Sequence, residues 1–263
     1  MSEGNSIVRS PAVELVNPEG SGAVLLLCEH ASCHMPERYD GLGLREEWRD
    51  SHAAWDPGAR AVALRLSEAL DAPLVASRVS RLVYDCNRPP EADSAMPVFS
   101  EVVEVPGNRD LTPAQRDERI ATVYRPFCDT VSALIEARRA RDLPTVLITV
   151  HSFTPVFYGK TRETEIGILH DADSRMADAM LAEAGRLPER RIERNKPYGP
   201  EDGVTHSLKI HGIAQGLPNV MIEFRNDLVA DAAGVAAMAQ DLMAMIGPAL
   251  VALGVDSKGA EDA

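Results

Sequence analysis

The sequence has few cysteines, and their spacing fits neither a disulfide framework nor a zinc finger. Its 263 residues contain four cysteines, and no two of them form a Cys-x-x-Cys pair. Free thiols are typical of a reducing compartment. The first 18 residues also carry no basic start and no long apolar run, so no signal peptide is visible. We therefore expect a cytoplasmic protein.

Long hydrophobic runs and an excess of basic residues are also missing. The longest apolar runs have five to six residues, far below the length of a membrane span. The net charge of −13 argues against a nucleic acid or an anionic membrane as the partner. A small anionic substrate remains compatible with this charge, provided that arginines gather locally to receive it.

The motifs of several enzyme classes are absent. No Gly-x-Ser-x-Gly elbow is present, which argues against a serine hydrolase. No phosphate-binding lysine loop and no Gly-x-Gly-x-x-Gly after a strand occur, so nothing supports nucleotide binding. Cys33 and His34 adjoin each other, but neighbours in sequence rarely reach the geometry of a nucleophile and its base.

Strand and helix patterns alternate along the chain, and an apolar fraction of 45% supplies a sizeable core. The predicted strands are 23–28, 73–76, 81–85, 145–150, 165–170 and 219–224. The predicted helices are 59–70, 114–141 with a bend at Pro126, 173–183, 205–215 and 230–253. This alternation predicts a three-layer α/β/α fold with a mixed, largely parallel sheet. We expect one domain over residues 21–254, a loose lead-in over 1–20 and a disordered tail over 255–263.

One stretch, Val-Leu-Ile-Thr-Val-His-Ser-Phe-Thr-Pro at 146–155, organises the rest of the chain. A buried strand ends there in His151 and Ser152, and a similar strand leads to His30. A third apolar run ends in Glu223 and Arg225. Ligands of open α/β sheets bind at the carboxyl ends of such strands. The set therefore indicates a metal-assisted hydrolase.

Two histidines at strand ends need a third protein ligand to form a catalytic zinc site. Asp56 and His52 are the best candidates, and Asp50 is a weaker one. Asp56 also precedes Pro57, a pair that predicts a helix start with the aspartate as its cap. A structural role for either histidine remains the alternative.

Glu223 lies in an apolar run, where a carboxylate is costly unless it is paired or used. We interpret Glu223 as a general base beside a metal, with an ion pair to Arg225 as the alternative. Ser152, His206 and Arg225 are further candidates for substrate contact, although His206 also fits a helix cap.

The segment 81–88, Arg-Leu-Val-Tyr-Asp-Cys-Asn-Arg, concentrates charged and amide groups. Strand alternation would place Arg81 and Asp85 on one face, where they can pair. Asn87 and Arg88 follow the strand and are freer to meet a ligand, as a clamp for an anion or as donors to an oxyanion. The loop 89–110 is long enough to cover part of a site.

Five motifs in order resemble the N-formylglutamate amidohydrolase family, between about residues 23 and 250. They are Cys-Glu-His-Ala-Ser, Asp-Ser-His-Ala-Ala-Trp-Asp-Pro-Gly-Ala, Ser-Arg-Leu-Val-Tyr-Asp-Cys-Asn-Arg-Pro, His-Ser-Phe-Thr-Pro and Ile-Glu-Phe-Arg-Asn-Asp. The resemblance implies a hydrolase that depends on Zn²⁺, with a fold related to the zinc carboxypeptidases and aspartoacylase. It implies cleavage of N-formyl-L-glutamate to formate and glutamate, a late step of histidine breakdown.

The resemblance also implies roles for individual residues. By position, His30, His151 and Asp56 match the metal site, and Glu223 matches the base. Arg81, Asn87 and Arg88 match the polar cluster that holds substrate carboxylates or the oxyanion, with Arg88 as the catalytic member. The related carboxypeptidases take two ligands from His-x-x-Glu, whereas Cys33 stands three residues after His30 here. A carboxylate ligand must therefore come from elsewhere in the chain.

The expected substrate is a small anionic N-acyl amino acid. Two alternatives stay open at this point. One is a deacylase that removes a different acyl group, and the other is a non-catalytic small-molecule-binding protein on the same fold.

Overall fold

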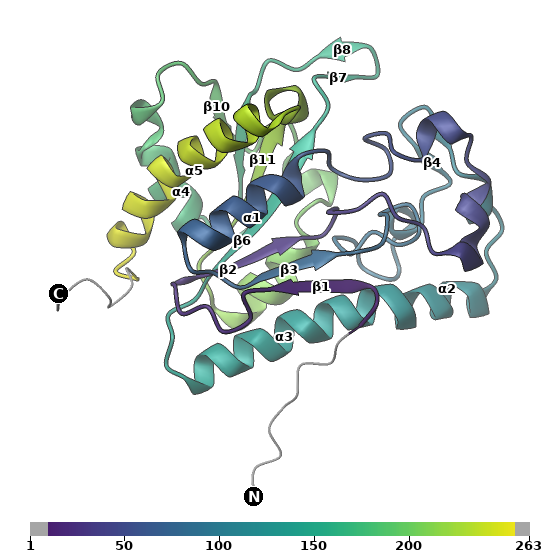
Figure 1. The fold of residues 1–263 in the computed structure, drawn as a ribbon, viewed down its shortest axis with the longest axis horizontal. Helices are drawn as coiled ribbons and strands as arrows, with labels where there is room; N and C mark the ends of the chain where they lie inside the picture. Colours follow the sequence, from purple (N-terminus) through teal and green to yellow (C-terminus); the bar gives the residue numbers. More distant parts are fainter. Residues whose placement is uncertain (1–9, 256–263) are drawn as a thin grey trace, which may run out of the picture.

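A computed structural model describes residues 10–255 of the chain. Its centre is a seven-stranded sheet in the order β1-β3-β2-β6-β11-β9-β10 (Figure 1). The strands are β1 (Val13–Val16), β2 (Val24–Cys28), β3 (Leu74–Ser77), β6 (Val146–Phe153), β9 (Ile166–Leu169), β10 (Ile192–Arg194) and β11 (Asn219–Arg225). Strands β3, β2, β6 and β11 run parallel, whereas β1 and the β9–β10 pair run antiparallel to their neighbours β3 and β11. The mixed, largely parallel sheet is confirmed.

Helices cover both faces of this sheet. They are α1 (Ala59–Ala69), α2 (Pro113–Arg119), α3 (Arg125–Ala140), α4 (Arg175–Ala182) and α5 (Ala232–Ala252). Helices α1, α4 and α5 lie on one face, and α3 lies on the other (Figure 1). The three-layer α/β/α arrangement predicted from the sequence is thus confirmed.

The apolar residues of the central strands explain this layering. Alternate residues of β2 point to opposite faces, so Val24 and Leu26 join the core under α1 and α5, and Leu25 and Leu27 join the core under α3. All four are fully buried. A strand that is apolar on both faces is stable only inside a sheet covered on both sides.

Helix α5 is long and apolar enough to cross a membrane by length and composition alone. Its residues Met238, Leu242, Met245 and Ile246 are, however, fully buried in the core formed with α1 and α4. Its apolar character therefore serves the packing of the sheet.

Two short hairpins extend beyond the sheet. Strands β4 (Phe99–Ser100) and β5 (Val103–Glu104) pair within the loop 89–110. Strands β7 (Val156–Phe157) and β8 (Lys160–Thr161) pair directly after β6. Both hairpins contribute residues to the cavity described below.

Three predictions of local structure are wrong. Residues 81–85 form a turn and not a strand, because Ser80 accepts hydrogen bonds from the backbone of Val83 and Tyr84. Part of the expected loose lead-in forms β1, which pairs with β3. The expected helix start at Asp56 lies at Gly58, whose φ of 82° ends the preceding turn before α1 begins.

The long helix expected over 114–141 is present in three parts. Its irregularity is a π-helical turn over Ile120–Tyr124 directly before Pro126, and such a turn accommodates a residue that cannot donate a backbone N–H inside a continuous helix. A capping box of Thr112 and Gln115 starts α2. The tail from residue 256 onward and residues 1–9 lie outside the described residues.

Candidate metal centre and active site

A cavity of about 210 Å³ opens where β2, β6 and β11 end. Its lining contains most of the residues predicted from the sequence. The lining residues are His30, His52, Asp56, Arg81, Asn87, Arg88, Ser100, Glu101, His151, Ser152, Phe153, Thr154, Phe157, Tyr198, Val204 and Glu223. Ser100 and Glu101 come from the loop 89–110, so this loop does cover one side of the cavity.

The sheet brings the two predicted histidines together. His151 lies within β6, next to β2, and His30 follows the end of β2 by two residues. Both side chains are almost fully buried, at 3% exposure for His30 and 1% for His151. Glu223 of β11 is the direct partner of His151 across the parallel strands. The register of three adjacent strands therefore sets the relative position of the three side chains.

Asp56 reaches the same point from the turn before α1. Its backbone N–H donates to the carbonyl of His30 at 3.0 Å, which ties this turn to the loop after β2. Its carboxylate is directed at the histidines and caps no helix. Ser152 supports the turn, since its hydroxyl donates to the carbonyl of Pro57 at 2.7 Å.

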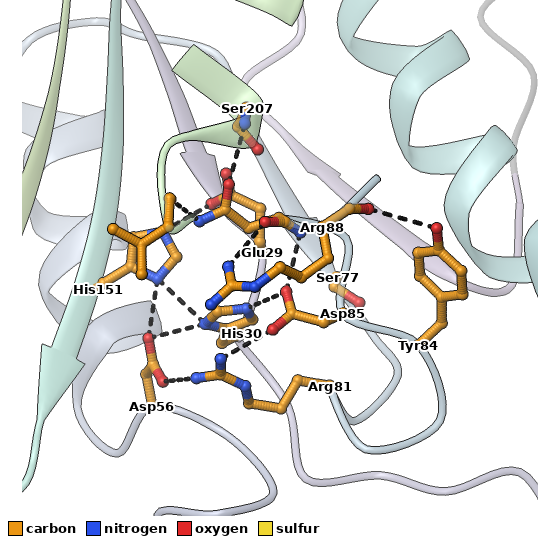
Figure 2. A network of polar contacts seen from close by, with 12 residues as sticks. Glu29, His30, Asp56, Ser77, Arg81, Tyr84, Asp85, Arg88, His151 and Ser207 are labelled. Atoms are coloured by element: carbon orange, nitrogen blue, oxygen red, sulfur yellow. Dashed lines mark hydrogen bonds and ion pairs between the residues drawn. The ribbon is translucent and has the colours of Figure 1, made fainter. Parts of the chain in front are cut away.

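Three ligand atoms converge in this cluster (Figure 2). Oδ2 of Asp56 lies 3.1 Å from Nδ1 of His30 and 2.9 Å from Nδ1 of His151, and the two Nδ1 atoms are 3.2 Å apart. Ligands of a four-coordinate ion with bonds of 2.0–2.1 Å are about 3.3 Å apart. The residues therefore fit a metal ion held by two imidazole nitrogens and one carboxylate oxygen.

The outer nitrogens of both rings support this assignment. Nε2 of His30 lies 2.7 Å from Oδ1 of Asp85, and Nε2 of His151 lies 3.2 Å from Oε2 of Glu29. Carboxylates only accept hydrogen bonds, so with an ion bound each Nε2 would direct its proton to a carboxylate and each Nδ1 would offer its lone pair to the ion. Two imidazole nitrogens and one carboxylate oxygen could then hold the ion from three sides.

The charge balance of the cluster points the same way. Four carboxylates are buried in or beside it: Glu29, Asp56, Asp85 and Glu223. Two guanidinium groups also line the cavity, those of Arg81 and Arg88. Such a concentration of buried carboxylates beside two imidazoles is a suitable environment for a divalent cation.

Burial and neighbouring charges shift the pKa values of this cluster in opposite directions. Burial alone would raise the pKa of Asp56 and Asp85, but the adjacent His30 and Arg81 hold both below their ordinary values. Burial alone would lower the pKa of His151, yet Glu29 and Asp56 raise it well above the usual range. Burial raises the pKa of Glu223 to about 7, and its Oε2 has no hydrogen-bond partner among the described residues. Glu223 is thus the one carboxylate here that readily takes up a proton near neutrality.

Arg81 serves the carboxylates of the cluster. Its Nη1 donates to Oδ1 of Asp56 at 3.3 Å, and its Nη2 donates to Oδ2 of Asp85 at 2.8 Å. The predicted pairing of Arg81 with Asp85 is correct, although a turn and not a strand produces it. Since Arg81 bridges two carboxylates, its capacity to hold a substrate carboxylate is largely used.

The side chains of Asn87 and Arg88 differ in how many hydrogen bonds they form within the protein. Asn87 lines the cavity, but its amide donates to the carbonyl of Val204 and accepts from the N–H of Ser207 at 2.9 Å. It therefore braces two loops. Arg88 lines the cavity, donates from Nη1 to the carbonyl of Asn87 at 2.8 Å, and helps to lower the pKa of Asp85.

The remaining predicted residues lie outside the metal cluster. His52 lines the cavity but pairs with Glu101 at 2.9 Å, so the structure brings Asp56 and not His52 to the two histidines. His206 accepts or donates a hydrogen bond with the hydroxyl of Tyr124, and it is absent from the lining. Arg225 pairs with Asp227 at 2.8 Å and also lies outside the lining, although substrate contact was predicted for it.

Sequence reasoning missed the role of Glu29, whose side chain is entirely buried against His151. The signal was present, because a carboxylate after a run of five buried apolar residues is as costly as Glu223 in β11. It also missed two aromatic residues of the lining, Phe153 at the end of β6 and Phe157 in the β7–β8 hairpin.

Comparison with known proteins agrees with these observations. The family model described as N-formylglutamate amidohydrolase matches residues 22–230. The crystal structure of gene product Atu2144 from Agrobacterium tumefaciens is 55% identical, with a TM-score of 0.90, and the match covers 92% of this chain and 96% of that one.

A more distant structure shares the fold. The N-formylglutamate amidohydrolase from Ralstonia eutropha JMP134 has a TM-score of 0.69 at 17% identity, over 93% of this chain and 99% of that one. No curated protein matches the chain significantly. Because the family model spans most of the sequence, the chain belongs to the N-formylglutamate amidohydrolase family.

Proposed function

We propose that the protein is a zinc-dependent amidohydrolase that converts N-formyl-L-glutamate, or a similar small N-acyl acidic amino acid, to the free amino acid and the carboxylic acid. The observation that supports this best is the convergence of His30, His151 and Asp56 beside the buried Glu223. Two imidazoles and one carboxylate are a common ligand set of catalytic zinc sites, which keep one position open. When bound, the ion would polarise the amide carbonyl and activate a water molecule.

Glu223 performs the proton transfers in this proposal. Its carboxylate accepts a proton from the water that attacks the formyl carbon, and it then delivers that proton to the nitrogen of the leaving amine. The C–N bond breaks, and formate and the amino acid result. Burial favours this role, because a carboxylate with raised proton affinity both accepts and returns the proton.

Arg88 stabilises developing negative charge. It borders the same cavity as Glu223, and its Nη1 bonds to a backbone carbonyl and not to a carboxylate. A guanidinium that meets the oxyanion at its formation lowers the barrier without binding the substrate more tightly in the ground state.

The first experiment combines metal analysis with an assay for formate release from N-formyl-L-glutamate. We expect about one zinc per chain and activity that a chelator abolishes and added zinc restores. The variant Asp56→Asn should lose the metal, whereas His52→Ala should keep it. His34→Ala is the matched control, because His34 is an exposed histidine in the loop that follows His30.

Two outcomes would redirect the assignment. Zinc without formate release would support a deacylase for another acyl group, which N-acetyl and N-succinyl derivatives of glutamate and aspartate would identify. A protein with neither metal nor activity after zinc is added back would contradict the hydrolase and favour a small-molecule-binding protein.

A further inference from the structure

The two short hairpins that contribute to the cavity wall are joined by one side chain, that of Glu101. Glu101 lies in the turn between β4 and β5, and its Oε1 accepts a hydrogen bond from the backbone N–H of Tyr158 at 2.8 Å. Tyr158 lies in the turn between β7 and β8, 57 residues further along the chain. The hairpins form separate two-stranded sheets, so this bond connects segments that share no strand pairing in the described part of the chain.

The other carboxylate oxygen of Glu101 holds a third segment. Oε2 of Glu101 lies 2.9 Å from Nε2 of His52, in the turn that leads to Asp56. Glu101 and His52 both line the cavity, and their side chains are 12% and 35% exposed. One carboxylate therefore connects both hairpins with the segment that supplies a candidate metal ligand.

The charged form of Glu101 makes both contacts. Burial alone would raise the pKa of Glu101, but the N–H of Tyr158 and the side chain of His52 hold it below its ordinary value, and the charge of Arg162 adds to this effect. Charge-assisted hydrogen bonds of this kind are stronger than bonds between neutral groups. At neutral pH the carboxylate is thus ionised and can bind both partners at once.

The backbone of both turns is unusual for the residue types that occupy it. Glu101 has a φ of 53° and Tyr158 a φ of 47°, in the left-handed region that glycine adopts freely. Other L-residues are disfavoured in this region. The hydrogen bond between the two turns offsets part of this cost, so removal of the Glu101 side chain should loosen the turns.

The two hairpins differ in how well the rest of the fold anchors them. Val103 of β5 is 2% exposed and belongs to the core under α3. In the segment 156–161, by contrast, every residue except Phe157 is exposed. The ring of Phe157 lies 4.3 Å from the guanidinium carbon of Arg162. Segments with few buried contacts open most readily, so the β7–β8 hairpin is the movable partner and Glu101 holds it from the anchored side.

The metal cluster itself is shielded from solvent. His30, Asp56 and His151 are each at most 3% exposed. A ligand reaches them through the cavity, whose wall includes Glu101 of one hairpin and Phe157 of the other. Movement of the β7–β8 hairpin away from Glu101 would therefore widen the path to the cluster.

We propose that Glu101 is a positioning residue that holds the β7–β8 hairpin against the cavity and thereby controls the passage of metal ions and small molecules to the cluster. This inference rests on the proposed function, because it assumes that the cluster binds a metal ion. Glu101 acts through the hairpin and touches no member of the cluster, so it should set the rates of entry and exit and leave the affinity unchanged.

The test measures the rates of zinc uptake and release with a chromophoric chelator. In Glu101→Ala both rates should rise on the order of 10-fold, because a hydrogen bond to a charged group no longer holds the hairpin. The dissociation constant for zinc should stay at the wild-type value. Glu101→Gln, which keeps an acceptor for the N–H of Tyr158, should show a smaller rise. Glu104→Ala is the matched control, because Glu104 is an exposed residue of the same hairpin that pairs with Arg109.

A role of Glu101 in the cluster itself gives a different result. In that case Glu101→Ala would weaken the affinity for zinc while the rate of uptake stayed the same, which would overturn the proposal. Wild-type rates of both uptake and release in Glu101→Ala would also overturn it.

Hydrogen exchange separates this inference from the proposed function. If the wild-type protein binds no zinc, the proposed function fails, but the exchange of the backbone amides of 156–161 still tests Glu101. Exchange that is faster on the order of 10-fold in Glu101→Ala, with exchange in α5 unchanged, would support the inference. Equal exchange of this segment in the wild type and the variant would overturn it.

Discussion

Oε2 of Glu29 lies 3.2 Å from Nε2 of His151, at the end of the ring opposite to the ligand atom Nδ1 (Figure 2). The Glu29 side chain is entirely buried and forms an ion pair with His151. Such a carboxylate fixes the tautomer of a metal-binding imidazole and raises its basicity.

Replacement of Glu29 by Gln should therefore weaken metal binding. We expect the dissociation constant for zinc to rise about 10- to 100-fold, because the outer carboxylate no longer orients His151. Competition with a chromophoric chelator measures this constant directly. Glu163→Gln is the control, since Glu163 is exposed and pairs with Arg191, which is no member of the cluster. Equal zinc affinity in Glu29→Gln and the wild type would contradict the assigned role.

Replacement of Glu223 by Gln should separate catalysis from metal binding. Glutamine has nearly the same shape but cannot accept the proton, so kcat should fall by about 10²- to 10⁴-fold. Zinc content should stay at the wild-type level, because Glu223 is outside the three-residue cluster. A variant that keeps both zinc and near-normal turnover would show that another group is the base.

His211 makes stability depend on pH. It is 4% exposed, its Nε2 has no hydrogen-bond partner among the described residues, and burial lowers its pKa to about 4. In the unfolded chain its pKa returns to about 6.5. Between these values only the unfolded state takes up the proton, so the free energy of unfolding falls as the pH drops from about 6.5 to 4.

This contribution reaches about 3 kcal/mol below pH 4. In His211→Gln it should vanish, so the loss of stability between pH 7 and pH 4 should be smaller than in the wild type by about that amount. Urea unfolding at a series of pH values measures the difference. His34→Gln should keep the wild-type slope, because His34 is exposed.

Arg138 supports the fold far from the cavity. It is 2% exposed in α3 and donates to the carbonyls of Gly20 and Pro144 and to the hydroxyl of Thr145. Arg138→Met leaves these carbonyls without donors and should lower the free energy of unfolding by about 3 kcal/mol. Arg139→Met on the same helix is the control, because Arg139 is exposed. A similar urea midpoint for both variants would contradict this role.

The sequence allowed the sheet to be predicted because its strands are apolar runs bounded by turn residues. The strand predicted over 81–85 is wrong because Val83 and Tyr84 favour strands by residue type, whereas their backbone N–H groups donate to the carbonyl of Ser80 in a turn. The helix cap predicted at Asp56 is wrong for a different reason. Its neighbour Pro57 fits a helix start, but the histidines compete for its carboxylate, and Gly58 delays the helix.

The sequence could predict those residues of the candidate site that lie at or directly after the ends of strands. His30, His151 and Glu223 end apolar strands, and the sheet brings them together for that reason. The engagement of Asn87 with Val204 depends on a loop more than 100 residues away in sequence, which no local pattern contains. Arg225 lies outside the cavity lining and pairs with Asp227, an acidic neighbour that is visible in the sequence.

The residues of the candidate metal centre are also far apart along the chain, and this separation bears on how the site forms. The contacts of His30 and His151 with Asp56 join residues 26 and 95 positions apart, and the two histidines are separated by 121 positions. The cluster thus exists only after the central strands have assembled, and an unfolded chain offers no comparable site. An ion that binds only the native state stabilises the whole domain by mass action, so its concentration should set the thermal midpoint of unfolding.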